Sequence, residues 1–137
     1  MMRTIALVAA LALSASCAPE PPSRARERQV VAWRTLGSWS GRGSTQTESF
    51  AFESGSLRVR WQTANEAPAT TGRFRLVLRS AISGRELAVA ADHRGAGRGE
   101  SNIPETPHSA YMLVESENID WSFTVEEGVS GTARSAR

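Results

Sequence analysis

The sequence of 137 residues has no lysine and a single cysteine, Cys17. With one cysteine, no disulfide forms within the chain, so packing and hydrogen bonds must hold the fold together. The sequence has only two histidines, His93 and His108. Without thiol partners they are too few for a structural zinc site. We therefore predict a fold that needs neither a metal nor a cofactor.

Positive charge is scarce on the part of the chain that is expected to fold. The formal net charge is +2, but between Trp33 and Glu127 ten arginines face twelve acidic residues. The excess of positive charge comes from arginines towards the ends of the chain: Arg3, Arg24, Arg26, Arg28, Arg134 and Arg137. A nucleic-acid-binding domain carries its positive charge on the folded surface, so no nucleic-acid partner is expected.

The sequence also lacks an apolar run long enough to span a bilayer, which takes about 20 residues. Its longest run, Ile5–Leu13, follows the basic residue Arg3 and precedes small residues at Ser14, Ala15 and Ser16. This order is typical of a secretory signal peptide. We predict that residues 1–16 direct export and are then removed.

The segment Leu13-Ser14-Ala15-Ser16-Cys17 resembles the lipobox of bacterial lipoproteins. The resemblance implies that Cys17 becomes the first mature residue, is acylated, and anchors the protein to a membrane of the cell envelope. In a Gram-negative cell this is the outer membrane or a periplasm-facing position. The family usually places leucine where Ser14 stands. Ordinary cleavage after Ala18, or an unmodified thiol, therefore remains an alternative.

The segments that flank the expected domain have a different composition. Residues 17–30 are rich in proline and arginine, which predicts an extended spacer behind the anchor. Arginines in this spacer can contact anionic lipid headgroups, although a solvated tether is the simpler interpretation. Residues 128–137 are predicted to be a disordered tail.

Between residues 31 and 127, apolar and polar residues alternate in steps of two, which is typical of half-buried strands. Such segments are Leu57–Trp61, Phe74–Arg79, Leu87–Ala91 and Trp121–Val125. Ala110–Val114 is apolar on both faces and predicts a central strand. Turn-forming residues separate the segments. We predict one all-β domain, an antiparallel two-sheet sandwich of seven or eight strands, jelly-roll or immunoglobulin-like, with a small barrel as the alternative.

Three stretches of this domain, Trp39–Gly43, Leu57–Trp61 and Asp120–Val125, are similar to stretches in small β-sandwich modules of exported bacterial proteins. The resemblance implies the fold and assigns no functional residue.

Outward-facing arginines are the main candidate binding residues. Two share a face of one predicted strand and three share a face of the next: Arg58 and Arg60, then Arg73, Arg75 and Arg79. If these strands pair, the five guanidinium groups form one anion-binding face suited to carboxylate or phosphate. The alternative is ion pairing with Glu48, Glu53 or Glu86.

The four tryptophans divide into two groups. Trp61 and Trp121 are in register with core residues and should be buried, whereas Trp33 and Trp39 are less constrained. An exposed Trp33/Trp39 pair would stack on a sugar ring; packing at the end of a sheet is the alternative. The alternating glycines Gly95, Gly97 and Gly99 predict a strand that an aromatic ring approaches closely.

Two polar clusters are further candidates for a functional site. Asp92 and His93 are adjacent, so on a strand they point to opposite faces and do not form a catalytic dyad. The acidic turn residues Glu115, Glu117, Asn118 and Asp120 offer oxygen ligands for Ca²⁺, but lack the spacing of an EF-hand. A solvated turn is the simpler interpretation.

The sequence as a whole predicts a non-enzymatic module of the cell envelope that binds a ligand or partner, either a cell-wall polymer or an envelope protein. The alternatives are a structural component of an envelope complex and a hydrolase of unrecognised type.

The lipobox resemblance makes a direct prediction about the mature N-terminus. Mass spectrometry of the protein from a bacterial host should find an acylated Cys17 as the first residue. An unmodified chain that begins at Pro19 would instead identify ordinary signal cleavage.

Overall fold

The computed structural model describes residues 28–133, so the predicted signal peptide and Cys17 lie outside the described residues. The described chain consists of strands and connecting loops and has no helix, and therefore none long and apolar enough to cross a membrane. The strands are β1 (Arg28–Arg42), β2 (Thr45–Gln46), β3 (Phe50–Ala51), β4 (Ser56–Ala64), β5 (Arg73–Ser80), β6 (Glu86–Arg94), β7 (Gly97–Pro104), β8 (Ser109–Glu117) and β9 (Asp120–Ala133).

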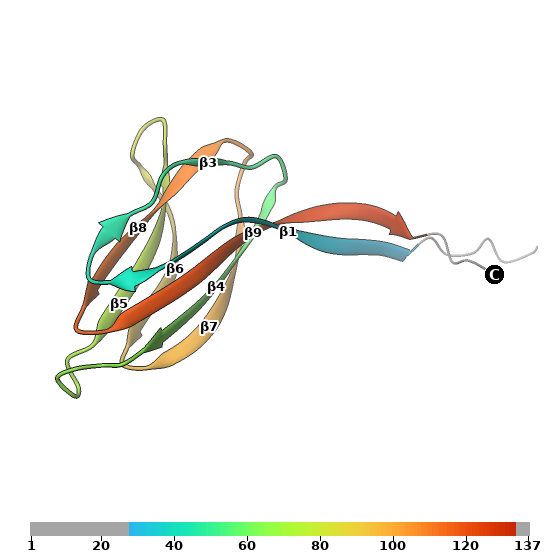
Figure 1. Ribbon diagram of the computed structural model, residues 1–137. Coiled ribbons are helices and arrows are strands. Elements are labelled where there is room, and N and C mark those ends of the chain that lie inside the picture. The colour runs from blue at the N-terminus through green and yellow to red at the C-terminus, as the bar shows by residue number, and fades with distance from the viewer. Residues whose placement is uncertain (1–27, 134–137) are drawn as a thin grey trace, which may run out of the picture.

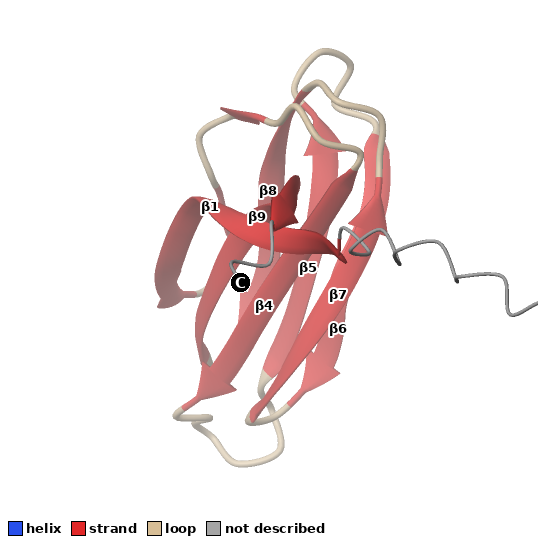
Figure 2. Ribbon diagram, turned by 90° about the vertical axis from the view of Figure 1, so that its right-hand side faces the viewer, coloured by secondary structure: helices blue, strands red, loops and turns tan. Residues whose placement is uncertain are grey.

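The strands form two antiparallel sheets that pack face to face (Figures 1 and 2). One sheet has four strands in the order β1-β9-β4-β7. The other has the order β2-β8-β5-β6, with β3 also paired to β8. The prediction of an all-β two-sheet sandwich is confirmed. The two-residue strands β2 and β3 bring the number of strands to nine. As expected, β8 is a central strand, between β5 on one side and β2 and β3 on the other.

The core lies between the sheets, where the apolar side chains of the alternating segments point inward. Leu57 and Val59 of β4, Leu76 of β5 and Val125 of β9 are fully buried. Trp121 is also buried, as predicted, and its indole Nε1 donates to the backbone oxygen of Gly43 at 2.9 Å. Burial of these side chains is the main favourable term for a domain without disulfides.

Two glycines of β7 make room for aromatic rings of neighbouring strands, as predicted. A Cβ atom at Gly99 would lie 2.6 Å from Cζ2 of Trp61, and one at Gly97 would lie 2.5 Å from Nε2 of His93. Trp61 was expected to be buried but is only half-buried, and it packs against Phe74 and His93, with ring centroids 5.7 and 5.0 Å apart. The glycines therefore allow the edge strand to approach this aromatic cluster.

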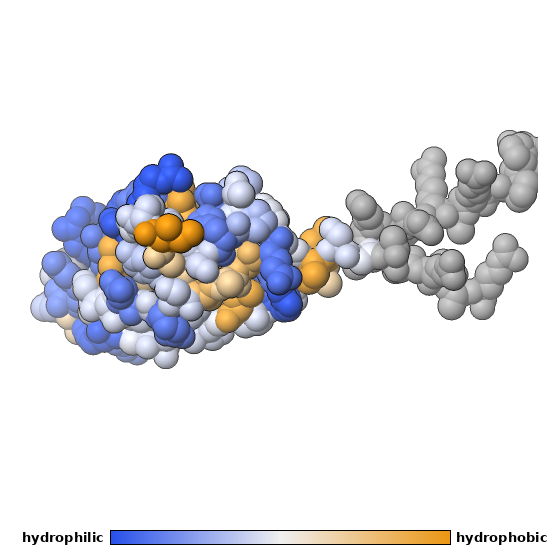
Figure 3. Space-filling view, turned by 90° about the horizontal axis from the view of Figure 1, so that it is seen from above, coloured by the Kyte–Doolittle hydropathy of each residue, from blue (hydrophilic) through white to orange (hydrophobic). Residues whose placement is uncertain are grey.

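Beyond the sandwich, β1 and β9 continue together as a two-stranded ribbon (Figure 1). The ladder runs to the pair Arg28 and Ala133, so residues 128–133 form a strand where a disordered tail was expected, and residues 28–30 belong to β1. Cross-strand hydrogen bonding orders this small-residue segment although it has little apolar content. Figure 3 shows hydrophobic residues on the ribbon, where Val31 is 56% and Val129 is 42% exposed.

Glu127 fixes the base of the ribbon. Its buried carboxylate accepts hydrogen bonds from the Arg34 guanidinium and from the backbone amides of Glu53 and Ser54, the latter two at 2.9 and 3.1 Å. Burial alone raises the pKa of Glu127, but these hydrogen bonds outweigh it and lower the pKa below the usual range. One carboxylate thus ties β9 to β1 and to the loop before β4.

The close approach of Trp61 to β7 predicts a strong effect of adding one methyl group. Gly99→Ala should lower the free energy of unfolding by about 2 kcal/mol, because the packed Trp61 ring has little room to move. Thermal denaturation should show this as a fall in Tm of about 10 °C. Gly55→Ala is the matched control, because the nearest atom to its added Cβ is 3.9 Å away. An equal effect of both substitutions would contradict the close packing at Gly99.

Candidate functional site: the outer groove

The outer face of the four-stranded sheet is almost entirely polar. Residues that are directly opposite in an antiparallel pair share a face, so the register defines rows of side chains across β1, β9, β4 and β7. One row consists of Ser38, Thr124, Arg60 and Glu100, and the next consists of Ser40, Ser122, Gln62 and Arg98.

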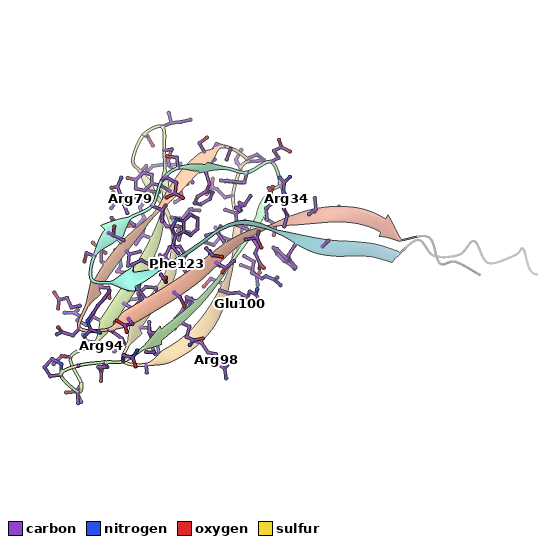
Figure 4. All side chains as sticks on the ribbon, viewed as in Figure 1. Arg34, Arg79, Arg94, Arg98, Glu100 and Phe123 are labelled. Atoms are coloured by element: carbon purple, nitrogen blue, oxygen red, sulfur yellow. The ribbon has the colours of Figure 1, made fainter. Side chains whose placement is uncertain are left out.

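These eight residues line a groove of about 690 Å³, which we call the outer groove, and the row between them completes its lining: Trp39, Phe123, Trp61 and Gly99. Serine and threonine supply short side chains from β1 and β9, while β4 and β7 supply longer ones, so the surface is hollow above the hydroxyl groups. The aromatic residues of the same strands turn the other way. Phe123 lies between the sheets, whereas Arg98 projects away from the sandwich (Figure 4).

Several polar side chains of the outer groove are available to a ligand. Within residues 28–133, the side chains of Gln62, Arg98 and Glu100 make no hydrogen bond or ion pair with the protein. Ser38 and Thr124 are partners, with their hydroxyl oxygens 2.9 Å apart. The outer groove therefore presents donors and acceptors on rigid strands with few internal partners.

A buried carboxylate holds one edge of the outer groove. The Glu126 side chain is 7% exposed and accepts hydrogen bonds from Arg58 Nε at 2.7 Å and Arg60 Nη2 at 3.1 Å. Hydrogen bonds between ionised groups are short and strong. Arg60 is thereby held at the wall of the outer groove, and the single negative charge of Glu126 is shared between Arg58 and Arg60.

Trp33 lies on the same outer face, next to this cluster. The Arg58 guanidinium lies over the Trp33 ring, 4.2 Å from the centroid, in cation–π geometry. Trp39, by contrast, turns inward and packs on Phe123, with ring centroids 5.3 Å apart. The exposed Trp33/Trp39 pair considered from the sequence is therefore not formed, and Trp33 alone faces outward.

The predicted five-arginine face is wrong. Arg58 and Arg60 lie on β4, which pairs with β7 and β9, whereas Arg73, Arg75 and Arg79 lie on β5, which pairs with β6 and β8. The loop between β4 and β5 carries the chain from one sheet to the other, so the two arginine groups belong to different sheets.

On β5, the arginines mostly find internal partners. Arg75 lies 2.6 Å from Glu115 and 3.5 Å from Glu86, and Arg79 donates to the backbone oxygen of Gly84 at 3.1 Å. The pairing with Glu86 was one of the alternatives expected from the sequence.

A second hollow of about 460 Å³ lies on the five-stranded sheet and includes Asp92 and His93. Its charged residues balance in sign once Asp92 is included, because three arginines stand against Asp92 and two glutamates: Arg73, Arg75, Arg94, Glu115 and Glu117. Asp92 is exposed, while His93 turns inward against Trp61. The prediction that these two residues point to opposite faces is confirmed, and Asp92 does not orient His93.

The acidic turn before β9 is stabilised by hydrogen bonds rather than arranged as a cation site. Asp120 accepts from Asn65 at 2.9 Å and from Arg42 at 3.0 Å, and these hydrogen bonds lower the pKa of its carboxyl group. In the described part of the chain, no group of three or more His, Cys, Asp or Glu residues is placed to hold a metal ion.

Comparisons with known proteins give little further information. No family model matches the chain, and no curated protein matches it. One similar solved structure contains the CBM22-1 and GH10 modules of the Clostridium thermocellum xylanase 10B, complexed with xylohexaose. The identity is 13% and the TM-score 0.37, over 77% of this chain and 27% of that chain. A likeness of this degree supports no argument about function.

The outer groove was not predicted from the sequence. The sequence does contain small hydroxyl residues at the polar positions of two alternating segments: Ser38 and Ser40 in one, Ser122 and Thr124 in the other. Only the register of β1 with β9 brings the two pairs together.

Proposed function

We propose that the protein is a non-enzymatic binding module whose outer groove binds a hydroxyl-rich polymer, a glycan of the cell wall. The observation that supports this proposal is a set of polar side chains on one sheet face that have no partner among residues 28–133: Gln62, Arg98 and Glu100.

The chemistry of the outer groove suits hydroxyl groups. A serine or threonine hydroxyl both donates and accepts, and glutamine does the same with separate atoms. Arg98 adds donors and Glu100 adds acceptors, so a sugar hydroxyl can find a partner whether it donates or accepts a hydrogen bond. Because strands hold the backbone at these positions, only the side-chain rotamers have to be ordered on binding.

The charge of the outer groove favours a neutral or weakly charged polymer. Arg58 and Arg60 share the single negative charge of Glu126, and the charge of Arg98 is opposed by that of Glu100 two positions along β7. A polyanion would find no concentrated positive field here. The open form of the groove suits a chain that lies along the sheet.

The proposed location follows from the sequence. If Cys17 is lipidated, the proline-rich spacer before β1 places the start of that strand at up to about 30 Å from the membrane. An outer groove in that position is within reach of cell-wall glycans.

A structural role is the second candidate, and one observation favours it. Strand β1 is at the edge of its sheet. On the side away from β9, its backbone pairs with no other strand within the described residues. An edge strand of this length, with exposed Val31, can pair with a strand of a second copy. Binding through β1 would build an assembly and leave the outer groove without a role.

The glycan proposal predicts a specific loss of binding. The mature chain should be retarded in native gels that contain soluble xylan, hydroxyethyl cellulose or solubilised peptidoglycan strands. Arg98→Ala should weaken the retarding interaction about tenfold, because it removes charge-assisted hydrogen bonds. Arg85→Ala is the matched control, since Arg85 is an exposed arginine on the β5–β6 loop.

Equal retardation of Arg98→Ala and Arg85→Ala would contradict binding in the outer groove. No retardation by any of the three polymers, together with concentration-dependent dimers in sedimentation, would favour the structural role instead.

A further inference from the structure

We infer that Trp33 is a second contact point for the same polymer, a platform on which one sugar ring stacks beyond the end of the outer groove. This inference rests on the proposed function and extends the binding surface towards the ribbon.

The register places Trp33 on the face of the outer groove. Trp33 is opposite Gly128, and Thr124, Glu126 and Gly128 alternate with inward-facing residues along β9. Thr124 belongs to the outer groove, and Gly128 is four residues further on. At about 3.3 Å per residue, Trp33 lies about 13 Å from the middle of the groove. A polymer that follows β9 therefore passes over both.

The Trp33 ring is held in place before any ligand arrives. Arg58 lies over the ring at 4.2 Å and is itself fixed by Glu126 at 2.7 Å. The ring also lies beside Gly128, where a Cβ atom would make ordinary contact with Cζ3 at 3.6 Å. An indole that is already oriented loses little conformational entropy when a ligand stacks on it.

The chemistry of Trp33 complements that of the outer groove. The groove offers hydrogen bonds to hydroxyl groups, while the half-buried indole offers an apolar surface on the face that Arg58 does not cover. A pyranose ring has both kinds of surface, with hydroxyls at its rim and C–H groups on its faces. The combination therefore selects a pyranose polymer long enough to reach from the outer groove to Trp33.

The dependence on length provides the test. Isothermal titration calorimetry should compare xylo-, cello- and peptidoglycan-derived oligosaccharides from disaccharide to octasaccharide. Trp33→Ala should weaken binding of the longest oligosaccharides about tenfold and leave that of the disaccharides unchanged, because only long chains reach the platform. Trp33→Phe should restore most of the affinity, since it keeps an aromatic surface. Arg98→Ala should weaken binding at every length.

The outcomes distinguish failure of the Trp33 platform from failure of glycan binding in the outer groove. If Arg98→Ala weakens binding but Trp33→Ala has no effect at any length, the proposal that a sugar stacks on Trp33 is wrong, whereas binding in the outer groove is supported. A loss with Trp33→Ala that is equal for all lengths, or that Trp33→Phe does not restore, would indicate a structural role for Trp33 and also overturn the platform. If the wild-type chain binds no oligosaccharide, both proposals fail. Thermal denaturation of each variant verifies that it is folded.

Discussion

The two consecutive glutamates of β9 determine how the four-stranded sheet is organised on both of its faces. Adjacent residues on a strand point in opposite directions, so Glu126 lies outside and Glu127 inside, and both are buried. Glu126 holds Arg58 and Arg60, which in turn position Trp33 and the wall of the outer groove. Glu127 binds Arg34 and the backbone before β4. A buried carboxylate is costly unless charged or polar groups surround it. These two glutamates therefore fix how β9 lies against β1 and β4, because any other arrangement would leave a buried carboxylate without its partners.

The same alternation separates the core from the candidate binding surface. In β9, Trp121, Phe123 and Val125 pack between the sheets, while Ser122 and Thr124 face the outer groove. The rigidity of the groove thus comes from the aromatic packing directly beneath it. Gly99 contributes in the same way, because it lets β7 approach Trp61 and carry its neighbours Arg98 and Glu100 to the groove. No disulfide is needed for this organisation.

The local features of the fold were predictable, and the long-range ones were not. Alternation located the main strands and the burial of Trp121, and adjacency placed Asp92 and His93 on opposite faces. Strand pairing is a property of the whole chain, so the arginines of β4 and β5 were expected on one face although a loop carries β5 into the other sheet. The outer groove was missed for the same reason, since its serines become neighbours only through the pairing of the first long strand with the last.

The most direct test of glycan binding in the outer groove is a map of the ligand on the sheet. Two-dimensional ¹H–¹⁵N spectra of the mature chain should be recorded during titration with solubilised peptidoglycan strands or xylo-oligosaccharides. Binding in the outer groove should shift amide signals of that groove, such as those of Gln62, Arg98 and Thr124, and the longer ligands should also shift the Trp33 indole signal. Shifts confined to the five-stranded sheet, for example at Arg75 and Val89, would contradict it.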